Sequence, residues 1–251
     1  MFTDRDWNVV LTSPGRDLLL AGLSVTLQLA GITIVLSTIL GTLVAVGRVS
    51  RSPALAPLRW LLTGYVEFFR NVPLLVQLMF WGFAVFSTDV ARAAAAPFNG
   101  LYSNQFLAGV CGLTVYTSAY IAEVLRSGLQ SVPKGQLEAA RASGLPYWQA
   151  MRLVVLPQVA RLVVAPMGNQ YIGATKNTSI VMVLGVADLV FQAQQIEAAT
   201  FRGVEAFTAV IAVFVVICLL ESLVLHLATR RWSAGRRAGL SLRHRVALES
   251  E

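Results

Sequence analysis

The sequence contains few charged residues and almost no histidine or cysteine. Asp, Glu, Lys and Arg make up only 13% of its 251 residues, about half the share that is usual in soluble domains. The two histidines, His226 and His244, lie near the C-terminal end, so a histidine-based catalytic or metal centre lacks ligands. The two cysteines, Cys111 and Cys218, lie in apolar runs, which favours small buried hydrophobes over a disulfide or a metal pair.

Motifs of common enzyme classes are absent from the sequence as well. It has no glycine-rich loop of the Walker A type, no Gly-x-Ser-x-Gly elbow and no His/Cys cluster with metal-ligand spacing. We therefore expect a non-catalytic chain with no cofactor or metal of its own. A basic leader is also lacking, because Asp4, Asp6 and Asp17 lie at the start. We expect the first span, and not a cleaved leader, to direct membrane insertion.

Apolar residues, by contrast, are abundant: 56% of the residues are hydrophobic and the mean hydropathy is +0.65. Long apolar runs of this kind predict an all-α, polytopic membrane protein with one integral domain. We expect five transmembrane helices, at residues 18–47, 58–86, 105–125, 159–175 and 206–228. A further apolar run at 180–190 is shorter than the roughly 20 residues that a spanning helix needs. We expect this run to dip back or to pack on the outer side of the bundle.

The positions of the basic residues predict the orientation of the spans. The net charge is +7, and most Lys and Arg residues lie in the loop at 48–59, in the segment 131–157 and in the C-terminal tail. Basic loops stay on the cytoplasmic side, and five crossings place all three segments there. This distribution favours lipid headgroups over nucleic acid as the partner of the charge. We predict an extracytoplasmic lead-in at 1–17, one transmembrane domain at 18–232 and a basic cytoplasmic tail at 233–251.

The segment 131–157 has the pattern of two short helices joined at a bend. Pro133 suits a helix start, and Gly144 can end this helix in a left-handed conformation. A second short helix can follow Pro146, and Pro157 is expected to interrupt the chain after it. Two interpretations fit this hairpin. It is a loop that only connects two spans, or it is a docking element whose small residues let another protein approach closely.

The residues of the hairpin resemble a known family. Glu138-Ala139-Ala140, Gly144 and Leu156-Pro157 are similar to the EAA motif of type I ABC importer permeases, the membrane subunits of binding-protein-dependent uptake systems. Three further blocks resemble the polar amino-acid subfamily, the histidine, glutamine, arginine and glutamate type. These blocks are Phe69-Arg70-Asn71-Val72-Pro73-Leu74-Leu75-Val76-Gln77, Thr117-Ser118-Ala119-Tyr120-Ile121-Ala122-Glu123-Val124-Leu125-Arg126 and Lys176-Asn177-Thr178-Ser179. The resemblance covers nearly the whole chain, from the first span to about residue 232.

The resemblance implies a permease that works by alternating access in a bacterial inner membrane. It implies as partners a second permease subunit (itself or a paralogue), an extracytoplasmic solute-binding protein, and two ATPase subunits that bind ATP and magnesium. The ATPases would dock on the hairpin. The residues assigned to coupling in this way are Glu138, Ala139, Ala140, Gly144, Leu156 and Pro157. The block at 69–73 looks most like acidic-amino-acid permeases, which favours glutamate or aspartate as the solute.

Ionisable residues inside apolar spans are costly, and they therefore mark candidate functional groups. Glu67 and Arg70 are three residues apart, so one helix face can hold them as an ion pair. Alternatively Arg70, freed by the break at Pro73, faces the solute path and meets a substrate carboxylate. Glu123 and Arg126 repeat this spacing at the cytoplasmic end of the third span, where we expect a structural or gating pair.

A second group of candidates lies where the fourth span ends. An amino acid offers one carboxylate and one ammonium group, so its recognition needs fixed donors and an acceptor, often at helix ends. Helix capping, and snorkelling of a lysine to the surface, explain the same polar residues without a ligand. Together with Asn71, which lies beside Arg70, the candidates for the substrate path are Asn169, Gln170, Lys176, Asn177, Thr178 and Ser179.

Three further acidic residues have structural explanations. We expect Asp188 and Glu197 to be solvated groups on the outer face, and Glu221 in the last span to face the bundle interior.

An alternative function is an ATP-independent channel or secondary carrier for a small polar solute. A carrier would show paired interrupted helices in its two halves. Interruptions at Pro73 and Lys176 correspond only loosely, and uptake by the purified chain without an ATPase would favour this alternative.

Overall fold

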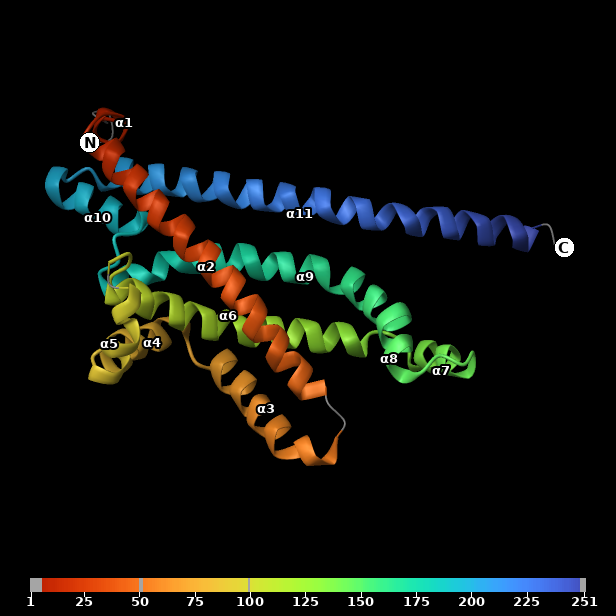
Figure 1. Ribbon diagram of the computed structural model, residues 1–251. Coiled ribbons are helices and arrows are strands. Elements are labelled where there is room, and N and C mark those ends of the chain that lie inside the picture. Colours follow the sequence, from red (N-terminus) through yellow and green to blue (C-terminus); the bar gives the residue numbers. More distant parts are fainter. Residues whose placement is uncertain (1–5, 50–51, 99, 249–251) are drawn as a thin grey trace.

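The computed structural model describes residues 6–49, 52–98 and 100–248, and of residues 230–248 it describes the backbone alone. Every regular element in these residues is helical, which confirms the all-α prediction. Figure 1 shows long helices that form a bundle, with short helices gathered at its two ends. The arginines of the predicted tail, from Arg230 onward, lie outside the residues whose side chains are described.

Long helices form the body of the bundle and short elements connect them. The long helices are α2 (Gly15–Val49), α3 (Ala56–Asn71), α6 (Asn104–Gln130), α9 (Leu156–Asn177) and α11 (Gly203–Leu248). The short elements before α6 are α1 (Asn8–Leu11), η1 (Pro53–Leu55), α4 (Leu74–Met79), the π-helical η2 (Phe80–Val85), α5 (Asp89–Ala95) and η3 (Ala96–Phe98). Those after α6 are α7 (Lys134–Ala142), α8 (Tyr147–Ala150), the π-helical η4 (Met151–Val155), the 3-10 helix η5 (Thr178–Leu184) and α10 (Leu189–Thr200).

Four helical runs are long and apolar enough to cross a membrane: Gly15–Val49, Asn104–Gln130, Tyr147–Leu184 and Gly203–Thr229. A bent pair, Pro53–Asn71 and Leu74–Val85, makes a fifth when it is counted as one span. This agrees with the five predicted crossings. Within the described residues the apolar run at 180–190 is not a span of its own, because its first part belongs to the run that includes α9.

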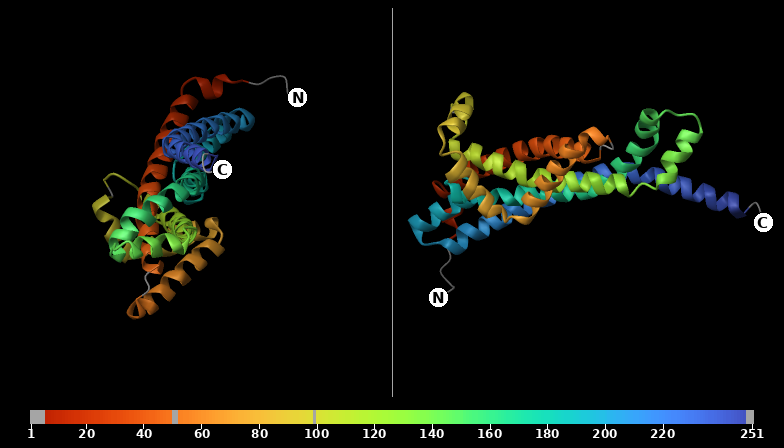
Figure 2. Two further views of the ribbon diagram at one scale, coloured as in Figure 1. Left: turned by 90° about the vertical axis from the view of Figure 1, so that its right-hand side faces the viewer. Right: turned by 90° about the horizontal axis from the view of Figure 1, so that it is seen from below.

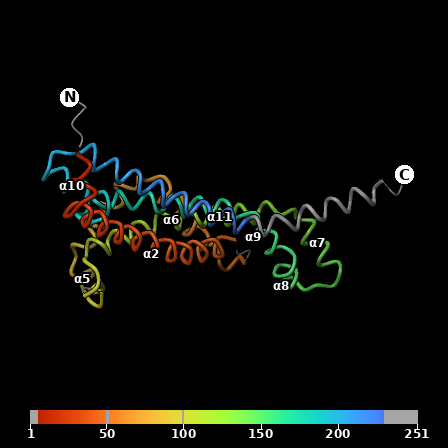
Figure 3. Tube along the Cα trace, turned by 90° about the horizontal axis from the view of Figure 1, so that it is seen from above, coloured from red at the N-terminus to blue at the C-terminus, as the bar shows by residue number. Residues whose placement is uncertain are grey.

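The two ends of the bundle separate the segments that the charge pattern distinguishes. The helices α1, α5 and α10 lie at one end, and α7 and α8 lie at the other (Figures 1 and 3). The end of α2 and the start of α3 lie at the hairpin end, because Arg48 and Arg59 line one cavity together with Lys134 of the hairpin. The basic loop at 48–59 and the hairpin therefore share an end.

The second apolar stretch is broken at Val72 and Pro73, where the chain bends by 108° between Pro53–Asn71 and Leu74–Val85. Pro73 has no backbone N–H, and it holds Val72 in an extended conformation (φ −93°, ψ 131°). The buried side chain of Gln77 compensates for the lost helical bonds. Its Nε2 donates to the carbonyl oxygens of Phe69 and Val72, both at 2.9 Å. This bridge fixes the bend and thereby the direction of the last turn of α3.

Small residues let α2 pack closely against its neighbours. A Cβ on Gly41 would lie 2.8 Å from the carbonyl oxygen of Ser118 in α6, and one on Gly22 would lie 2.8 Å from that of Asp188. Close backbone approach of this kind is how membrane helices associate.

The last long helix, α11, is largely exposed, since only 6% of its most apolar 18-residue window is buried. A large apolar face of the described chain is thus left for lipid or for another subunit.

The second helix of the hairpin does not end at Pro157 as predicted. The chain passes from α8 through the π-helical turn η4 directly into α9, and Pro157 lies in the first turn of α9. A proline is tolerated there because its missing N–H is not required for the helical ladder. At this junction Gln158 Nε2 donates to the carbonyl oxygen of Val154 at 2.8 Å. The second helix of the hairpin and the fourth span are therefore one helical run.

Asp188 is completely buried, so the prediction of a solvated outer-face group is wrong for this residue. It caps α10: its Oδ1 accepts a hydrogen bond from the backbone N–H of Phe191 at 2.8 Å, and within the described chain its Oδ2 has no partner. Burial raises the pKa of Asp188 to about 6, because a low-dielectric environment disfavours the charged carboxylate. The burial of Asp188 was not predictable from the sequence, because aspartate is common both at helix N-caps and in solvated loops. Glu197 is exposed, as predicted.

Replacing Asp188 by asparagine is expected to remove a pH dependence of stability. The pKa is raised from 3.8 to about 6 on folding, so between these values the folded protein keeps a proton that the unfolded chain has lost. The free energy of unfolding therefore falls as the pH rises through this interval, by about 3 kcal/mol in total. Asparagine keeps the capping oxygen without the charge. Asp188→Asn should be more stable than wild type at neutral pH and equal to it at a pH below both pKa values.

Thermal unfolding of both proteins in detergent at the two pH values measures this effect. Glu197→Gln, which neutralises an exposed carboxylate nearby in the chain, is the control and should leave the pH profile unchanged. Identical profiles for wild type and Asp188→Asn would show that the carboxylate is solvated.

Candidate functional site

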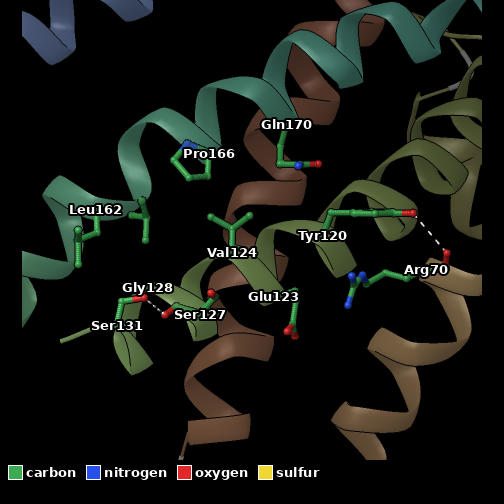
Figure 4. A pocket seen from close by; sticks show the side chains of 11 residues that line it. Arg70, Tyr120, Glu123, Val124, Ser127, Gly128, Ser131, Leu162, Pro166 and Gln170 are labelled. Carbon is green, nitrogen blue, oxygen red and sulfur yellow. Dashed lines mark hydrogen bonds between the residues drawn. The ribbon is translucent and has the colours of Figure 1, made fainter. Parts of the chain in front are cut away.

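A cavity of about 440 Å³ opens between α3, α6 and α9. It brings together side chains from three parts of the chain: Arg70 from the last turn of α3, Tyr120 and Glu123 from α6, and Gln170 from α9 (Figure 4). Apolar side chains such as Leu162, together with two serines, line the rest of the wall. Two predicted substrate-path residues, Arg70 and Gln170, thus line one cavity.

The guanidinium group of Arg70 is placed over an aromatic ring, and among the described residues it has no anionic partner. Its Cζ lies 5.4 Å from the centre of the Tyr120 ring, a distance at which a cation is attracted to the ring face. The Tyr120 hydroxyl donates a hydrogen bond to the carbonyl oxygen of Arg70 at 3.3 Å, which ties the end of α3 to α6. Within the described residues, the buried Nε of Arg70 has no hydrogen-bond partner. An unpaired buried donor of a charged group is costly and suits an anionic ligand.

The predicted alternative, an ion pair between Glu67 and Arg70, is absent. Across the described chain no ion pair includes either residue. Glu67 is exposed, whereas Arg70 turns toward Tyr120. Asn71 also points away from the cavity: it is exposed, and its Nδ2 donates to the carbonyl oxygen of Glu67 at 2.7 Å. Asn71 therefore closes the end of α3 and is not placed to contact a ligand beside Arg70.

Glu123 joins two arginines at the edge of the cavity. It forms the expected pair with Arg126, whose Nε lies 3.0 Å from Oε2. It also accepts a hydrogen bond at 2.9 Å from Arg48 of α2, whose side chain is only 7% exposed. Arg48 was not predicted as a site residue, because the basic residues of the 48–59 loop are explained by membrane topology alone. The resulting triad links α2 to α6.

Lys176 and Ser179 lie in a different place from Arg70. They line a second cavity of about 670 Å³ between the end of α9 and α11, whose other walls are mainly apolar. The predicted set of substrate-path residues is thus divided between two cavities. The hydroxyl of Ser179 donates to the carbonyl oxygen of Lys176 at 2.7 Å, which is a local capping contact.

The remaining residues of this set have local surroundings. The Thr178 hydroxyl is buried and donates to the carbonyl oxygen of Thr175 at 2.7 Å, so it closes the end of α9. Asn169 is exposed and Asn177 is half-buried, and neither is among the residues that line the two cavities. Of the candidates at the end of the fourth span, Gln170 alone shares a cavity with Arg70.

Glu221 faces α9, in agreement with the expectation that it points into the bundle. Its Oε1 accepts a hydrogen bond from the Thr175 hydroxyl at 2.6 Å, and its Oε2 is buried without a partner in the described chain. This contact ties α11 to α9 at a depth where polar side chains hold helices together.

The first helix of the hairpin, α7, is exposed over most of its surface. In α7 only Leu137 and Ala140 are half-buried, and Leu137 packs against the apolar cluster around Val155. At 100° per residue the opposite face carries Glu138, Ala139 and Ala142, all of which are exposed.

The bend of the hairpin and the start of α9 are open as well. Gly144 follows α7 with φ +89°, the left-handed conformation expected of a helix-ending glycine. Gly144, Leu156 and Pro157 are all exposed. Apart from the half-buried Ala140, the residues of the EAA-like motif are therefore exposed.

These features define a class of protein: an integral membrane bundle with a polar cavity between its helices and an exposed helical hairpin at one end. The family described as "Binding-protein-dependent transport system inner membrane component" matches residues 37–233. The chain belongs to this family.

Relatives with names and structures are similar over most of the chain. The probable glutamine ABC transporter permease protein GlnM of Bacillus subtilis is 38% identical over 84% of this chain and 92% of its own length. The glutamate/aspartate import permease protein GltK of Escherichia coli is 32% identical over 90% of this chain and 97% of its own. A crystal structure of an amino acid ABC transporter with histidines has a TM-score of 0.77 and 32% identity, and covers 91% of this chain and 100% of that chain.

The names of these relatives do not support the preference for an acidic solute. They include glutamine as well as glutamate and aspartate, so similarity to them does not select one charge type. They also give no support to the ATP-independent channel or carrier.

Proposed function

We propose that the chain is the non-catalytic permease subunit of an ABC importer for amino acids and works by alternating access. ATP and magnesium would be bound and ATP hydrolysed on partner subunits. The observation that carries the proposal is the exposed outer face of α7 together with the helical run that leads from the hairpin into α9, one wall of the Arg70 cavity. A partner that moves the hairpin would thereby move a wall of the cavity.

The cavity supports an amino acid as the solute. The guanidinium of Arg70 would bind the α-carboxylate that all amino acids share, and Gln170 would contribute an amide for the ammonium group or side chain. Tyr120 holds Arg70 in position through its ring and its hydroxyl. This arrangement selects for the backbone groups of the solute, so we propose no preference for acidic side chains. Lys176 and Ser179, in the second cavity, remain candidates for a separate contact along the path.

The orientation follows from the positive-inside rule. We propose that the hairpin, the 48–59 loop and the C-terminus are cytoplasmic, in a bacterial inner membrane. The N-terminus, residues 87–104 and residues 176–205 would then face outward. Their position at the opposite end from the hairpin supports this assignment (Figure 1).

The proposed assembly contains a second permease, identical or a paralogue, two ATPases and an extracytoplasmic solute-binding protein. The bare apolar face of α11 supports contact with another membrane subunit. The outer face of α7, with Glu138, Ala139 and Ala142, supports docking of an ATPase.

Reconstitution into lipid vesicles tests the proposal. The chain is assembled with the ATPase and the binding protein of the same transport system, and uptake of labelled amino acids is measured with and without ATP. We expect uptake to require all components and ATP. Uptake by the chain alone, at the same rate and without ATP, would overturn the proposal in favour of a carrier or channel.

A further inference from the structure

A third cavity lies at the hairpin end of the bundle and is lined by basic side chains. It measures about 590 Å³ and lies between α2, α3, α6 and the hairpin. Four basic residues line it: Arg48, Arg59, Arg126 and Lys134. No Asp or Glu is among its lining residues in the described chain. Glu123 lies outside this lining and contacts two of the four, Arg48 and Arg126.

The cavity lies at the level of the lipid headgroups and has a partly apolar wall. Val49 is the last residue of α2, and Gln130 is the last residue of α6, so the cavity opens where two spans end. Trp60, next to Arg59, is 74% exposed, and exposed tryptophans concentrate at the headgroup level of membranes. Apolar side chains, including Leu129 and Met151, form the rest of the wall. A cationic rim above an apolar wall suits a phosphate group that carries acyl chains.

We propose that this cavity binds the headgroup of an anionic phospholipid of the cytoplasmic leaflet. The phosphate would lie among the four cations, and the acyl chains would follow the apolar wall. Basic pockets between helix ends on the cytoplasmic side are suited to anionic headgroups. The proposal rests on the orientation given under Proposed function, which places this end in the cytoplasmic leaflet.

The position of the cavity gives such a lipid a structural role. Its walls come both from the bundle, through Arg48 and Arg59, and from the hairpin, through Lys134 and Tyr147. The right-hand view of Figure 2 shows the hairpin, in green, projecting from one end of the bundle. A bound phosphate would therefore connect the hairpin to α2 and α3 by charge. Anionic lipid in the membrane would then stiffen the hairpin before any ATPase docks.

The test measures which lipids the purified full-length chain retains. The protein is equilibrated with equal amounts of phosphatidylglycerol and phosphatidylcholine of the same acyl chains, and bound lipids are counted by native mass spectrometry. The variant is Arg59→Gln with Lys134→Gln, because these changes leave the Arg48–Glu123–Arg126 triad intact. The matched control is Arg141→Gln with Arg152→Gln, which removes two exposed charges that do not line the cavity.

We expect wild type to retain more phosphatidylglycerol than phosphatidylcholine. In the cavity variant the ratio of the two bound lipids should fall roughly tenfold, and in the control it should change less than about twofold. Equal losses in variant and control would overturn the proposal in favour of general surface charge. Loss of the lipid preference on addition of millimolar inorganic phosphate would overturn it in favour of a soluble anion. Thermal unfolding of each protein verifies that it is folded.

This measurement is independent of the proposed transport function. Lipid retention is measured on the permease without its ATPase. If the lipid preference is absent, the lipid site is overturned and the proposed ATP-driven uptake is unaffected. Conversely, lipid retention with no ATP-driven uptake would overturn the proposed function and keep the lipid site.

Discussion

Replacing Ala139 by arginine is expected to separate the permease from its ATPase and to abolish uptake. Ala139 lies on the exposed face of α7, opposite Leu137 and Ala140, which face the bundle. A long charged side chain on a face that must be approached closely would cost about 3 kcal/mol, or roughly a hundredfold in affinity. Binding of the purified ATPase to the permease in detergent measures the loss, and uptake into proteoliposomes measures its consequence.

The matched control for this change is Gln136→Arg. Gln136 is exposed on the same helix, but at 100° per residue it lies to the side of the face that carries Ala139. This variant should bind ATPase within about threefold of wild type. Gly144→Glu is a poorer test of docking, because the φ of +89° at Gly144 strains any other residue. Full uptake by the Ala139 variant would remove the hairpin from the coupling mechanism.

Neutralising Arg70 is the second change with a large expected effect. In Arg70→Gln the cavity loses the guanidinium that would bind the solute carboxylate. A charge-assisted hydrogen-bonded pair of this kind is worth about 3 kcal/mol when one partner is removed, so uptake at low solute concentration should fall about a hundredfold. ATPase binding should be unchanged, because Arg70 lies in the cavity and not on the hairpin.

Tyr120→Phe separates the role of the charge from that of the local structure. It removes the hydrogen bond to the carbonyl oxygen of Arg70 and keeps the ring beneath the guanidinium. The loss of one neutral hydrogen bond costs about 1 kcal/mol, so uptake should fall less than tenfold. Equal losses in the two variants would assign Arg70 to holding α3 against α6. Unchanged uptake by Arg70→Gln for every tested amino acid would show that it is not a ligand.

Features set by local chemistry were predictable from the sequence. The break at Pro73 follows from a missing N–H, the left-handed Gly144 follows from its position after an apolar helical face, and the spans follow from hydropathy. Pro157 shows where this reasoning reaches its limit. Proline disrupts the interior of a helix but fits its first turn, and the sequence did not indicate that a π-helical turn would place it there.

Pairings across the bundle were not predictable in the same way. Arg48 and Glu123 are 75 positions apart, and no periodicity within one helix relates them. For the same reason the polar residues around 170–179 looked like one group, although Gln170 and Lys176 line different cavities. Burial of Asp188 likewise depends on α2, whose Gly22 allows the backbone near Asp188 to come close.

The helical run from Tyr147 to Asn177 has a mechanical consequence. With no loop between the hairpin and the span, the run is a lever about 45 Å long. If it tilts as a stiff rod, a rotation of about 5° at one end displaces the other by about 4 Å. A displacement that a partner subunit imposes at Tyr147 would thus be transmitted to Lys176 along the helix backbone. Its size would depend on how much the π-helical turn at Met151–Val155 bends.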